Sequence, residues 1–147
     1  MKSELKEEKY TFSTDKEKLQ VEYIHHYLSK ESYWAQNIPL QIVEKSIEGS
    51  LCFGVYKENQ QVGFARVITD YATFGYLADV FIDKDHRGQG LSKKLMAFIL
   101  EQDSVKILRR FMLATLDAHG LYRQFGFNPL REPARFMELK AFEKYIE

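Results

Sequence analysis

The sequence predicts a mixed α/β fold of the α+β type, built on a mostly antiparallel central sheet that also contains one parallel pair of strands. Two apolar stretches, Leu51–Lys57 and Val62–Thr69, flank the polar turn Glu58–Gln61, which is the pattern of a β-hairpin. A third strand, Phe74–Ile82, extends the hairpin into an antiparallel meander. A whole helix then separates this strand from the strand Arg110–Leu116, so we expect these two strands to be parallel.

Composition and charge indicate one domain, residues 1–147. A chain of this length buries about 68–70% of its unfolded surface, and a hydrophobic content of 45% is ample for the core. Basic and acidic side chains are equal at 21 each, so no long-range field attracts nucleic acid or an anionic membrane, and neither partner is expected. We find no signal peptide and no apolar run near the roughly 20 residues that a bilayer requires, which predicts a cytoplasmic protein.

The first third of the chain is expected to supply helices. Residues 1–9 are highly charged and are expected to form a flexible, polar lead-in, followed by a short strand at Tyr10–Ser13. We expect a helix from there to about Ser29, capped by the side chain of Ser13, Thr14 or Asp15. Its apolar stripe consists of Leu19, Tyr23, Ile24, Tyr27 and Leu28. A second helix is expected near Leu40–Glu48.

The loop between these two helices, Lys30–Ile38, holds the only tryptophan of the chain, Trp34, beside Tyr33. The two aromatic rings either pack at the corner between the helices or form the wall of a substrate pocket, and the sequence leaves both interpretations open. Tyr33 and Trp34 are therefore candidate substrate-binding residues.

Side chains that commonly bind metals or act as nucleophiles are sparse. His25 and His26 are adjacent and project about 100° apart on a helix, so they do not form a chelate, and no metal is expected. The one cysteine, Cys52, lies in an apolar run and is expected to be a small buried side chain rather than a nucleophile.

The stretch Tyr76–Leu100 predicts a strand, a glycine loop and a helix in succession. Gly88 and Gly90 lie in the loop, where a missing side chain lets the backbone approach a ligand or take a positive φ. A helix N-terminus behind such a loop offers unpaired N–H groups and a positive dipole end to a phosphate, and Arg87 adds a full charge. The alternative is a tight turn that needs glycine only for packing.

The spacing of the glycines excludes both a Walker loop and a dinucleotide-binding fingerprint. The fingerprint is excluded because Lys93 stands where a third glycine is needed.

The segment Val80–Ser92 resembles the acyl-CoA-binding motif of the GNAT superfamily of N-acetyltransferases, whose loop reads Arg/Gln-x-x-Gly-x-Gly/Ala. Here it reads Arg87-Gly88-Gln89-Gly90-Leu91-Ser92, with Ser92 in place of the final Gly/Ala. The segment Ala118–Phe127 is similar to the later A-x-x-x-Y-x-x-x-G-F signature of the family. The resemblance spans roughly Leu51 to Leu139. It implies a GNAT-like sheet with a splayed parallel pair and helices on both faces. The sequence pattern itself predicts a closing strand at Arg135–Leu139, after the loop that contains Pro129 and Pro133.

The resemblance implies an acyltransferase that moves an acetyl group from acetyl-CoA to a primary amine of a small molecule or peptide, by direct attack on the thioester. Acetyl-CoA, the only cofactor implied, would lie between the two parallel strands. The implied contacts with it are made by Val80, Phe81, Ile82, Arg87, Gly88, Gln89, Gly90, Leu91 and Ser92. The competing hypothesis is a non-catalytic acyl-CoA-binding or sensing module with the same loop. The sequence also leaves a homodimer open.

The resemblance assigns Tyr122 as the general acid that protonates the departing thiolate. A tyrosine has a reference pKa of about 10, above that of a thiol, so it stays protonated at neutral pH. The alternative is a core tyrosine. Asp79 is the candidate general base, because burial in an apolar strand would raise its pKa. The alternatives for this role are His119, a water molecule, a backbone carbonyl or bulk solvent. On the acceptor side we expect Tyr33 and Trp34 with Arg66, which suits a carboxylate-bearing amine, and Tyr71.

Overall fold

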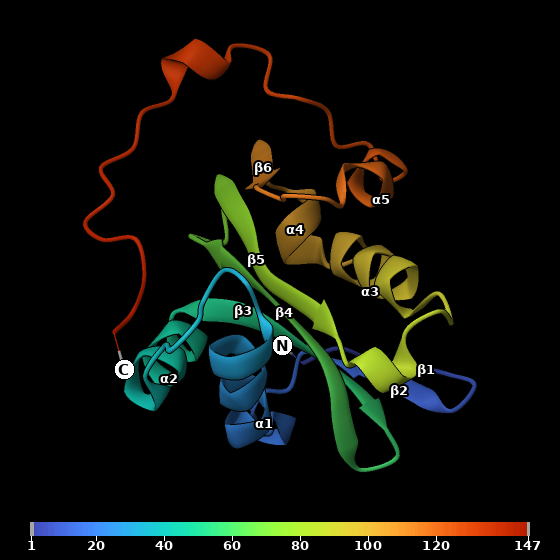
Figure 1. Ribbon diagram of the computed structural model, residues 1–147. Helices are drawn as coiled ribbons and strands as arrows, with labels where there is room; N and C mark the ends of the chain where they lie inside the picture. Colours follow the sequence, from blue (N-terminus) through green and yellow to red (C-terminus); the bar gives the residue numbers. More distant parts are fainter. Residues whose placement is uncertain (1, 147) are drawn as a thin grey trace.

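The computed structural model describes residues 2–146 as one six-stranded sheet with helices on both faces (Figure 1). The strands lie side by side in chain order, and they are β1 (Glu4–Glu7), β2 (Tyr10–Ser13), β3 (Ser50–Lys57), β4 (Gln60–Thr69), β5 (Phe74–Ile82) and β6 (Arg110–Leu113). The helices are α1 (Val21–His26), α2 (Leu40–Glu48), α3 (Leu91–Leu100), α4 (Asp103–Lys106) and α5 (His119–Arg123). Every neighbouring pair is antiparallel except β5 and β6, which are parallel, so the predicted fold class is confirmed.

Two hydrophobic clusters lie on opposite faces of the sheet, because side chains alternate between the faces along each strand. Phe53 packs with Leu95 and other residues of α3 on one face. Its neighbour Cys52 packs with Ile24 of α1 and Val43 of α2 on the other face. The sheet is therefore a central layer between α3 and the α1–α2 pair (Figure 1).

The N-terminal segment differs from the polar lead-in that the sequence predicts. Residues Glu4–Glu7 form β1, which pairs with β2 at the edge of the sheet. A hydrogen bond from Ser3 N to Thr14 Oγ1 (2.8 Å) and an ion pair of Lys18 Nζ with Glu4 (2.6 Å) fasten this strand. Its charged side chains hide the alternation that marks a strand, and charge of this kind discourages further pairing at an edge.

The first predicted helix is interrupted at Gln20. Asp15 caps only a single 3₁₀ turn, and α1 then starts at Val21 and continues into a π-helical turn, Tyr27–Glu31. The break comes from hydrogen bonds to the β3–β4 hairpin, since Gln20 N donates to Gln61 Oε1 (2.8 Å) and Gln61 N donates to Gln20 Oε1 (3.1 Å). The side chain of Gln61 is fully buried, so these bonds outweigh the local helix preference.

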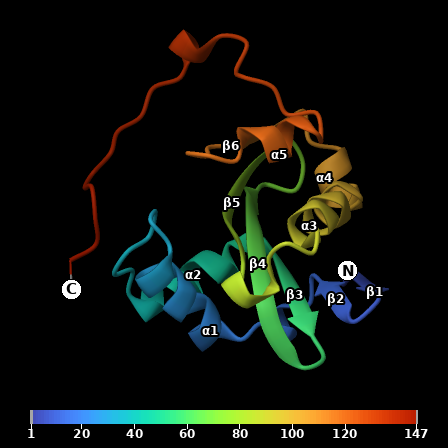
Figure 2. The ribbon, with the colours of Figure 1, turned by 45° about the vertical axis from the view of Figure 1, so that its right-hand side comes forward.

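The parallel pair is short and opens along β5. Residues Phe74–Leu77 of β5 pair with Arg110–Leu113 of β6, and the rest of β5, Ala78–Ile82, has no partner on that side. The strand β6 ends at Leu113 rather than at the predicted Leu116. Beyond that point the chain turns away from β5 toward α5 (Figure 2).

The predicted closing strand at Arg135–Leu139 is not formed. Residues Pro133–Arg135 make one 3₁₀ turn, and the side chains of Met137 and Leu139 are 97% and 95% exposed. The chain from Asn128 onward, which we call the C-terminal arm (residues 128–146), leaves the body near α5 and returns to it beside α2 (Figures 1 and 2). A strand needs a partner with free backbone groups, and the arm passes its own β6 without pairing.

Candidate active site

A cavity of about 430 Å³ lies where β5 and β6 separate. Its floor is the β5 segment Tyr76–Val80, and its opposite wall is the chain Leu113–Ala118 that follows β6. Tyr33 and Trp34 reach it from the loop after α1, and Tyr122 reaches it from α5. The structure thus brings together, in one cavity, four side chains that the sequence singled out separately: Tyr33, Trp34, Asp79 and Tyr122.

The backbone of β5 beside this cavity offers free hydrogen-bonding groups. One edge of β5 is paired with β4 along most of its length, whereas the edge that faces β6 is unpaired from Ala78 to Ile82. A ligand with amide groups can occupy the missing strand position, because buried backbone groups require partners. Val80 lines the cavity, while the side chains of Phe81 and Ile82 are buried in the core and can contribute only backbone atoms.

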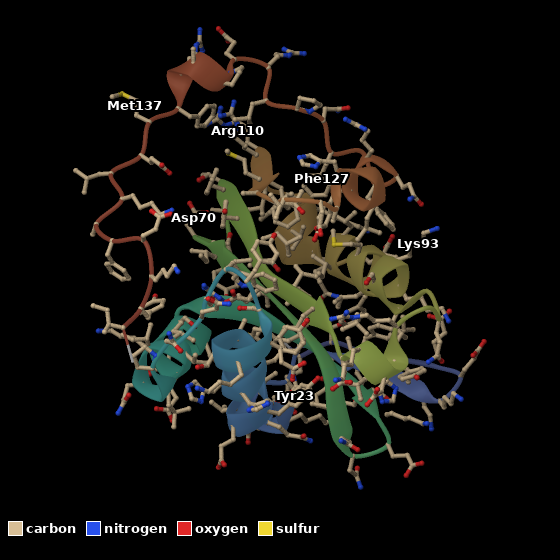
Figure 3. All side chains as sticks on the ribbon, viewed as in Figure 1. Tyr23, Asp70, Lys93, Arg110, Phe127 and Met137 are labelled. Atoms are coloured by element: carbon tan, nitrogen blue, oxygen red, sulfur yellow. The ribbon has the colours of Figure 1, made fainter. Side chains whose placement is uncertain are left out.

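The glycine loop at the far end of β5 has the geometry of an anion site. Gly88 and Gly90 have φ of 79° and 76°, in the left-handed region that other residues avoid. Gly90 precedes α3 with no side-chain cap, so the first N–H groups of this helix, including that of Leu91, lack intrahelical partners. No acidic residue stands in the first turn, and Lys93 projects outward there (Figure 3). These features favour a negatively charged ligand group.

Arg87 fastens the glycine loop to the body of the protein. Its Nε donates to the carbonyl oxygen of Ile82 (2.9 Å), and its Nη2 donates to the hydroxyl of Tyr27 (2.7 Å). The ring of Tyr27 in turn stacks on Phe81, with 3.8 Å between ring centroids. The positive charge of Arg87 therefore lies beside the glycine loop, and its guanidinium also holds the loop against Ile82 and Tyr27. The sequence analysis assigned Tyr27 only to an apolar stripe, and nothing in the sequence pairs it with Arg87.

Gln89 is held from the neighbouring strand β2. The hydroxyl of Tyr10 donates to Gln89 Oε1 (3.2 Å) and lies 3.0 Å from Nδ1 of His86. The loop is thus held before Gly88, through Arg87 and His86, and between its two glycines, through Gln89, which keeps its backbone positioned without a ligand. Ser92 lies in the first turn of α3, half-buried, where its small side chain leaves the N-terminus accessible.

Asp79 is held by two donors at the cavity. Its Oδ2 accepts from Arg66 Nε at 2.6 Å, and its Oδ1 accepts from Trp34 Nε1 at 2.8 Å. Arg66 is fixed in turn by Ser50 Oγ (3.1 Å). The backbone of Asp79 has φ of 54°, which costs conformational energy in a residue that is not glycine. The carboxylate links Arg66 of β4 to Trp34, which lines the cavity together with Tyr33.

Tyr122 is buried, with 8% of its surface exposed, at the end of the cavity formed by α5. Burial raises the pKa of its hydroxyl, and the nearby Tyr33 raises it further. The hydroxyl is therefore protonated throughout the neutral range. Thr115 Oγ1 accepts from Ala118 N (3.0 Å) just before α5 and so helps to fix this short helix. Nothing in the sequence indicates this role of Thr115, because the N-cap position of α5 is Ala118, which has no side-chain cap.

Several other candidates lie outside this cavity. Arg66 sits behind Asp79 and is already paired with it, and Tyr71 lies in the β4–β5 turn, where Asp70 accepts hydrogen bonds from backbone N–H groups. His119 faces a neighbouring cavity that also borders Tyr122. The thiol of Cys52 is buried in the α1–α2 cluster, and burial raises its pKa to about 11, which makes it a poor nucleophile.

Two kinds of feature are absent from residues 2–146. No helix in this range combines the length and the apolar character needed to cross a bilayer. Within the same residues, no three His, Cys, Asp or Glu side chains converge as metal ligands.

Comparisons with known proteins agree on one family. A family model described as an acetyltransferase (GNAT) domain matches residues 48–129. A protein of Gibberella zeae that is named an acetyltransferase is 33% identical, over 84% of this chain and 81% of its own. A solved structure from Xanthomonas campestris pv. campestris, assigned to the GNAT family, is 48% identical with a TM-score of 0.88, over 90% of this chain and 93% of its own.

A more distant structure shares the fold. A Clostridium acetobutylicum acetyltransferase, solved with acetyl-CoA, is 14% identical with a TM-score of 0.65, over 95% of this chain and 96% of its own.

Proposed function

Because this chain belongs to the GNAT family of acetyltransferases, we propose that it transfers an acetyl group from acetyl-CoA to a primary amine of a small molecule or peptide. The observation that carries the proposal is the unpaired edge of β5, Ala78–Ile82, which runs from the cavity to the glycine loop. One ligand with amide groups at one end and phosphates at the other suits this continuous path. Acetyl-CoA has both.

The residues present fit that donor. The backbone of Val80 offers partners for the amides of the pantetheine arm, and at Ile82 only the N–H can do so, because the carbonyl oxygen of Ile82 already accepts from Arg87. The loop from Gly88 to Leu91 offers N–H groups to the pyrophosphate. Neither glycine has any atom within 4 Å of the place where a Cβ would stand, so a ligand can approach the backbone directly. When bound, acetyl-CoA supplies an acyl group activated by a thiol leaving group.

Tyr122 is the proposed proton donor to the leaving sulfur. Its raised pKa keeps the proton on Oη until the thiolate departs, and its burial excludes water that would compete. Tyr122 lines the same cavity as Leu113 and Val80, where the reacting end of the donor would lie. No covalent enzyme intermediate is needed, since the amine attacks the thioester directly.

Tyr33 and Trp34 are the proposed acceptor-binding residues. They are 56% and 41% exposed at the mouth of the cavity, which is more than a packing role requires. We infer that Asp79 positions Trp34 through its indole N–H, because both carboxylate oxygens are already engaged by donors. Asp79 as the general base is the alternative, and it predicts a different kinetic defect. The cavity is built from one chain, so acetyl transfer does not itself require a homodimer.

A panel of primary amines tests the proposed function. The full chain is incubated with acetyl-CoA and each amine, and free thiol is measured over time. We expect at least one amine to accelerate thiol release, with the mass of the amine increased by one acetyl group. If acetyl-CoA binds by calorimetry and no amine in a broad panel accelerates release, the chain is a non-catalytic acyl-CoA-binding module instead.

A further inference from the structure

The cavity between β5 and β6 has acidic and aromatic walls. Two carboxylates border it, those of Asp79 and Asp117, and among residues 2–146 no lysine, arginine or histidine does. Asp79 is balanced by Arg66, whose Nε lies 2.6 Å from Oδ2. Arg66 itself does not line the cavity, so its guanidinium does not offer a partner to a carboxylate-bearing amine there. The lining therefore carries one uncompensated charge, the negative charge of Asp117.

Asp117 has no bonding partner in the described part of the chain. It lies between β6 and α5, and its exposed side chain makes no hydrogen bond or ion pair within residues 2–146. It does not cap α5, because the N–H of Ala118 is already bonded to Thr115 Oγ1 (3.0 Å) and α5 has no side-chain cap. A carboxylate without a partner at the rim of a cavity is available to a cationic group of a ligand.

The aromatic pair of the cavity lies next to this carboxylate. The hydroxyl oxygen of Tyr33 accepts a hydrogen bond from the N–H of Leu116 (3.4 Å), the residue before Asp117. The rings of Tyr33 and Trp34 meet edge to face, with 5.0 Å between their centroids, so at least one ring has faces that the other does not cover. The faces of aromatic rings are negative and attract ammonium groups. The carboxylate and the rings at this rim thus favour the same kind of group, a cation.

We propose that the acceptor is a diamine or polyamine, in which one amine attacks acetyl-CoA while a second, positively charged amine is held by Asp117 and by the rings of Tyr33 and Trp34. This assignment rests on the proposed function and narrows its acceptor. The attacking amine is neutral. Its nitrogen bonds to the acetyl carbon, the carbon–sulfur bond breaks, and the sulfur takes a proton from Tyr122. The new amide nitrogen releases one proton to solvent, solvent restores the proton of Tyr122, and the second amine stays protonated throughout.

The same rim discriminates against other amines. A monoamine of equal length lacks the group that Asp117 binds. An ω-amino acid would bring a second carboxylate beside Asp117, where no basic side chain of the lining offsets the repulsion. The cavity volume of about 430 Å³ is typical of a small-molecule site and suits a short aliphatic chain. Charge at the rim therefore selects the acceptor by its far end.

The first test compares amines that differ only at the far end. A series of α,ω-diaminoalkanes of increasing length is assayed with acetyl-CoA and the full chain, each beside the monoamine and the ω-amino acid of the same length, and free thiol is measured. At the best length we expect kcat/KM for the diamine to exceed that for the monoamine about five- to tenfold, since an exposed ion pair and a cation–π contact each contribute a fewfold. The ω-amino acid should be the poorest acceptor. Added salt should reduce the preference, because Asp117 is exposed.

Variants of Asp117 identify the source of the preference. Asp117→Asn should bring the diamine-to-monoamine ratio of kcat/KM close to one, mainly through a higher KM for the diamine. Asp117→Lys should make the ω-amino acid a better acceptor than the diamine. Asp103→Asn, the same change on α4 and outside this cavity, is the matched control and should keep the ratio of the unaltered protein.

The outcomes separate the acceptor assignment from the proposed function. If amines accelerate thiol release but no diamine is preferred, or if Asp117→Asn keeps the preference, the acceptor assignment is overturned and acetyl transfer stands. If acetyl-CoA binds and no amine accelerates release, both are overturned.

Discussion

The two ends of the sheet are built differently. At the β2–β4 end, β3 and β4 pair along almost their whole length, and Phe12, Phe53 and Phe64 are at most 1% exposed. At the β5–β6 end, β6 has four paired residues, and cavities lie on both of its sides. The paired end satisfies its backbone internally. The open end leaves backbone groups unpaired, and those groups are the ones available to a ligand.

The β2–β4 end of the sheet therefore serves mainly stability, and the β5–β6 end is the one open to a ligand. Burial of apolar surface stabilises the fold in proportion to the area removed from water, and the fully buried rings of Phe12, Phe53 and Phe64 lie at the paired end. Residues at the open end are freer to serve a ligand, since they contribute less to the core.

The largest effect is expected from truncating the paired core. Phe53→Ala removes a fully buried ring that contacts Phe98, with 6.0 Å between the ring centroids. We expect the free energy of unfolding to fall by about 3–5 kcal/mol in urea denaturation. Leu116→Ala, at the open end, removes a side chain that is 73% exposed and should change it by less than about 0.5 kcal/mol. Similar losses in the two variants would remove the contrast.

The next effect is on catalysis at the open end. Tyr122→Phe deletes only the hydroxyl, so we expect folding and acetyl-CoA binding to persist and kcat to fall by about a hundredfold, at the low end of general acid catalysis. The deficit should shrink with an acyl donor whose thiol has a lower pKa. Tyr71→Phe, outside the cavity, is the control and should keep full kcat.

The pH profile of Tyr122 provides a second readout. Its pKa lies above the ordinary value of about 10, so the proton is present at lower pH and is lost as the pH rises through the folded-state pKa. In the unaltered protein, kcat should therefore decline only above about pH 10. This decline should be missing in Tyr122→Phe. If Tyr122→Phe keeps full kcat, then Tyr122 only packs in the core, and solvent supplies the proton.

A smaller effect is expected at the glycine loop. Gly90 has a φ of 76°, and a β-branched residue there is strained by about 1–3 kcal/mol. Gly90→Val should weaken CoA binding about tenfold or more by calorimetry, a loss of about 1.4 kcal/mol. Arg87→Ala should weaken it less, because Arg87 mainly fastens the loop. Gly49→Ala, at a helix end with negative φ, is the control. Unchanged affinity in a folded Gly90→Val protein would refute the phosphate-loop assignment.

The smallest effect is expected on the acceptor side. Trp34→Phe removes the hydrogen bond to Asp79, and a bond of this kind contributes roughly 1 kcal/mol, or about fivefold. We expect the KM for the amine to rise by about that factor and the KM for acetyl-CoA to stay constant. Asp79→Asn should behave similarly if Asp79 positions Trp34. If Asp79 is the general base, kcat in Asp79→Asn should instead fall about a hundredfold or more.

The parts of the fold that local sequence specifies were predicted well. The strand Phe74–Ile82 has the predicted bounds, and α3 starts at Leu91, directly behind the glycine loop as predicted. The glycine loop has the predicted positive φ. In these segments, apolar periodicity and glycine positions act over a few residues, so they can be recognised without knowing the partner.

The parts that were missed depend on partners distant in the sequence. The break at Gln20 is set by Gln61 on the hairpin, and β1 is set by pairing with β2. The ion pair of Arg66 with Asp79 could not be predicted, because it requires the register of β4 against β5. The closing strand was predicted from its pattern, but the chain gives it no partner of its own. The sequence pattern indicates that a segment can form a strand, whereas the topology of the fold determines whether a partner strand is available.

Amide hydrogen exchange with and without saturating acetyl-CoA tests the central claim most directly. We expect exchange to slow at least about tenfold in two segments, Ala78–Ile82 on the unpaired edge of β5 and Gly88–Lys93 in the glycine loop. Exchange in β3, Ser50–Lys57, should stay unchanged, because its backbone is already paired. If acetyl-CoA binds by calorimetry while neither segment slows, the open end of the sheet is not the donor site, and the account is wrong.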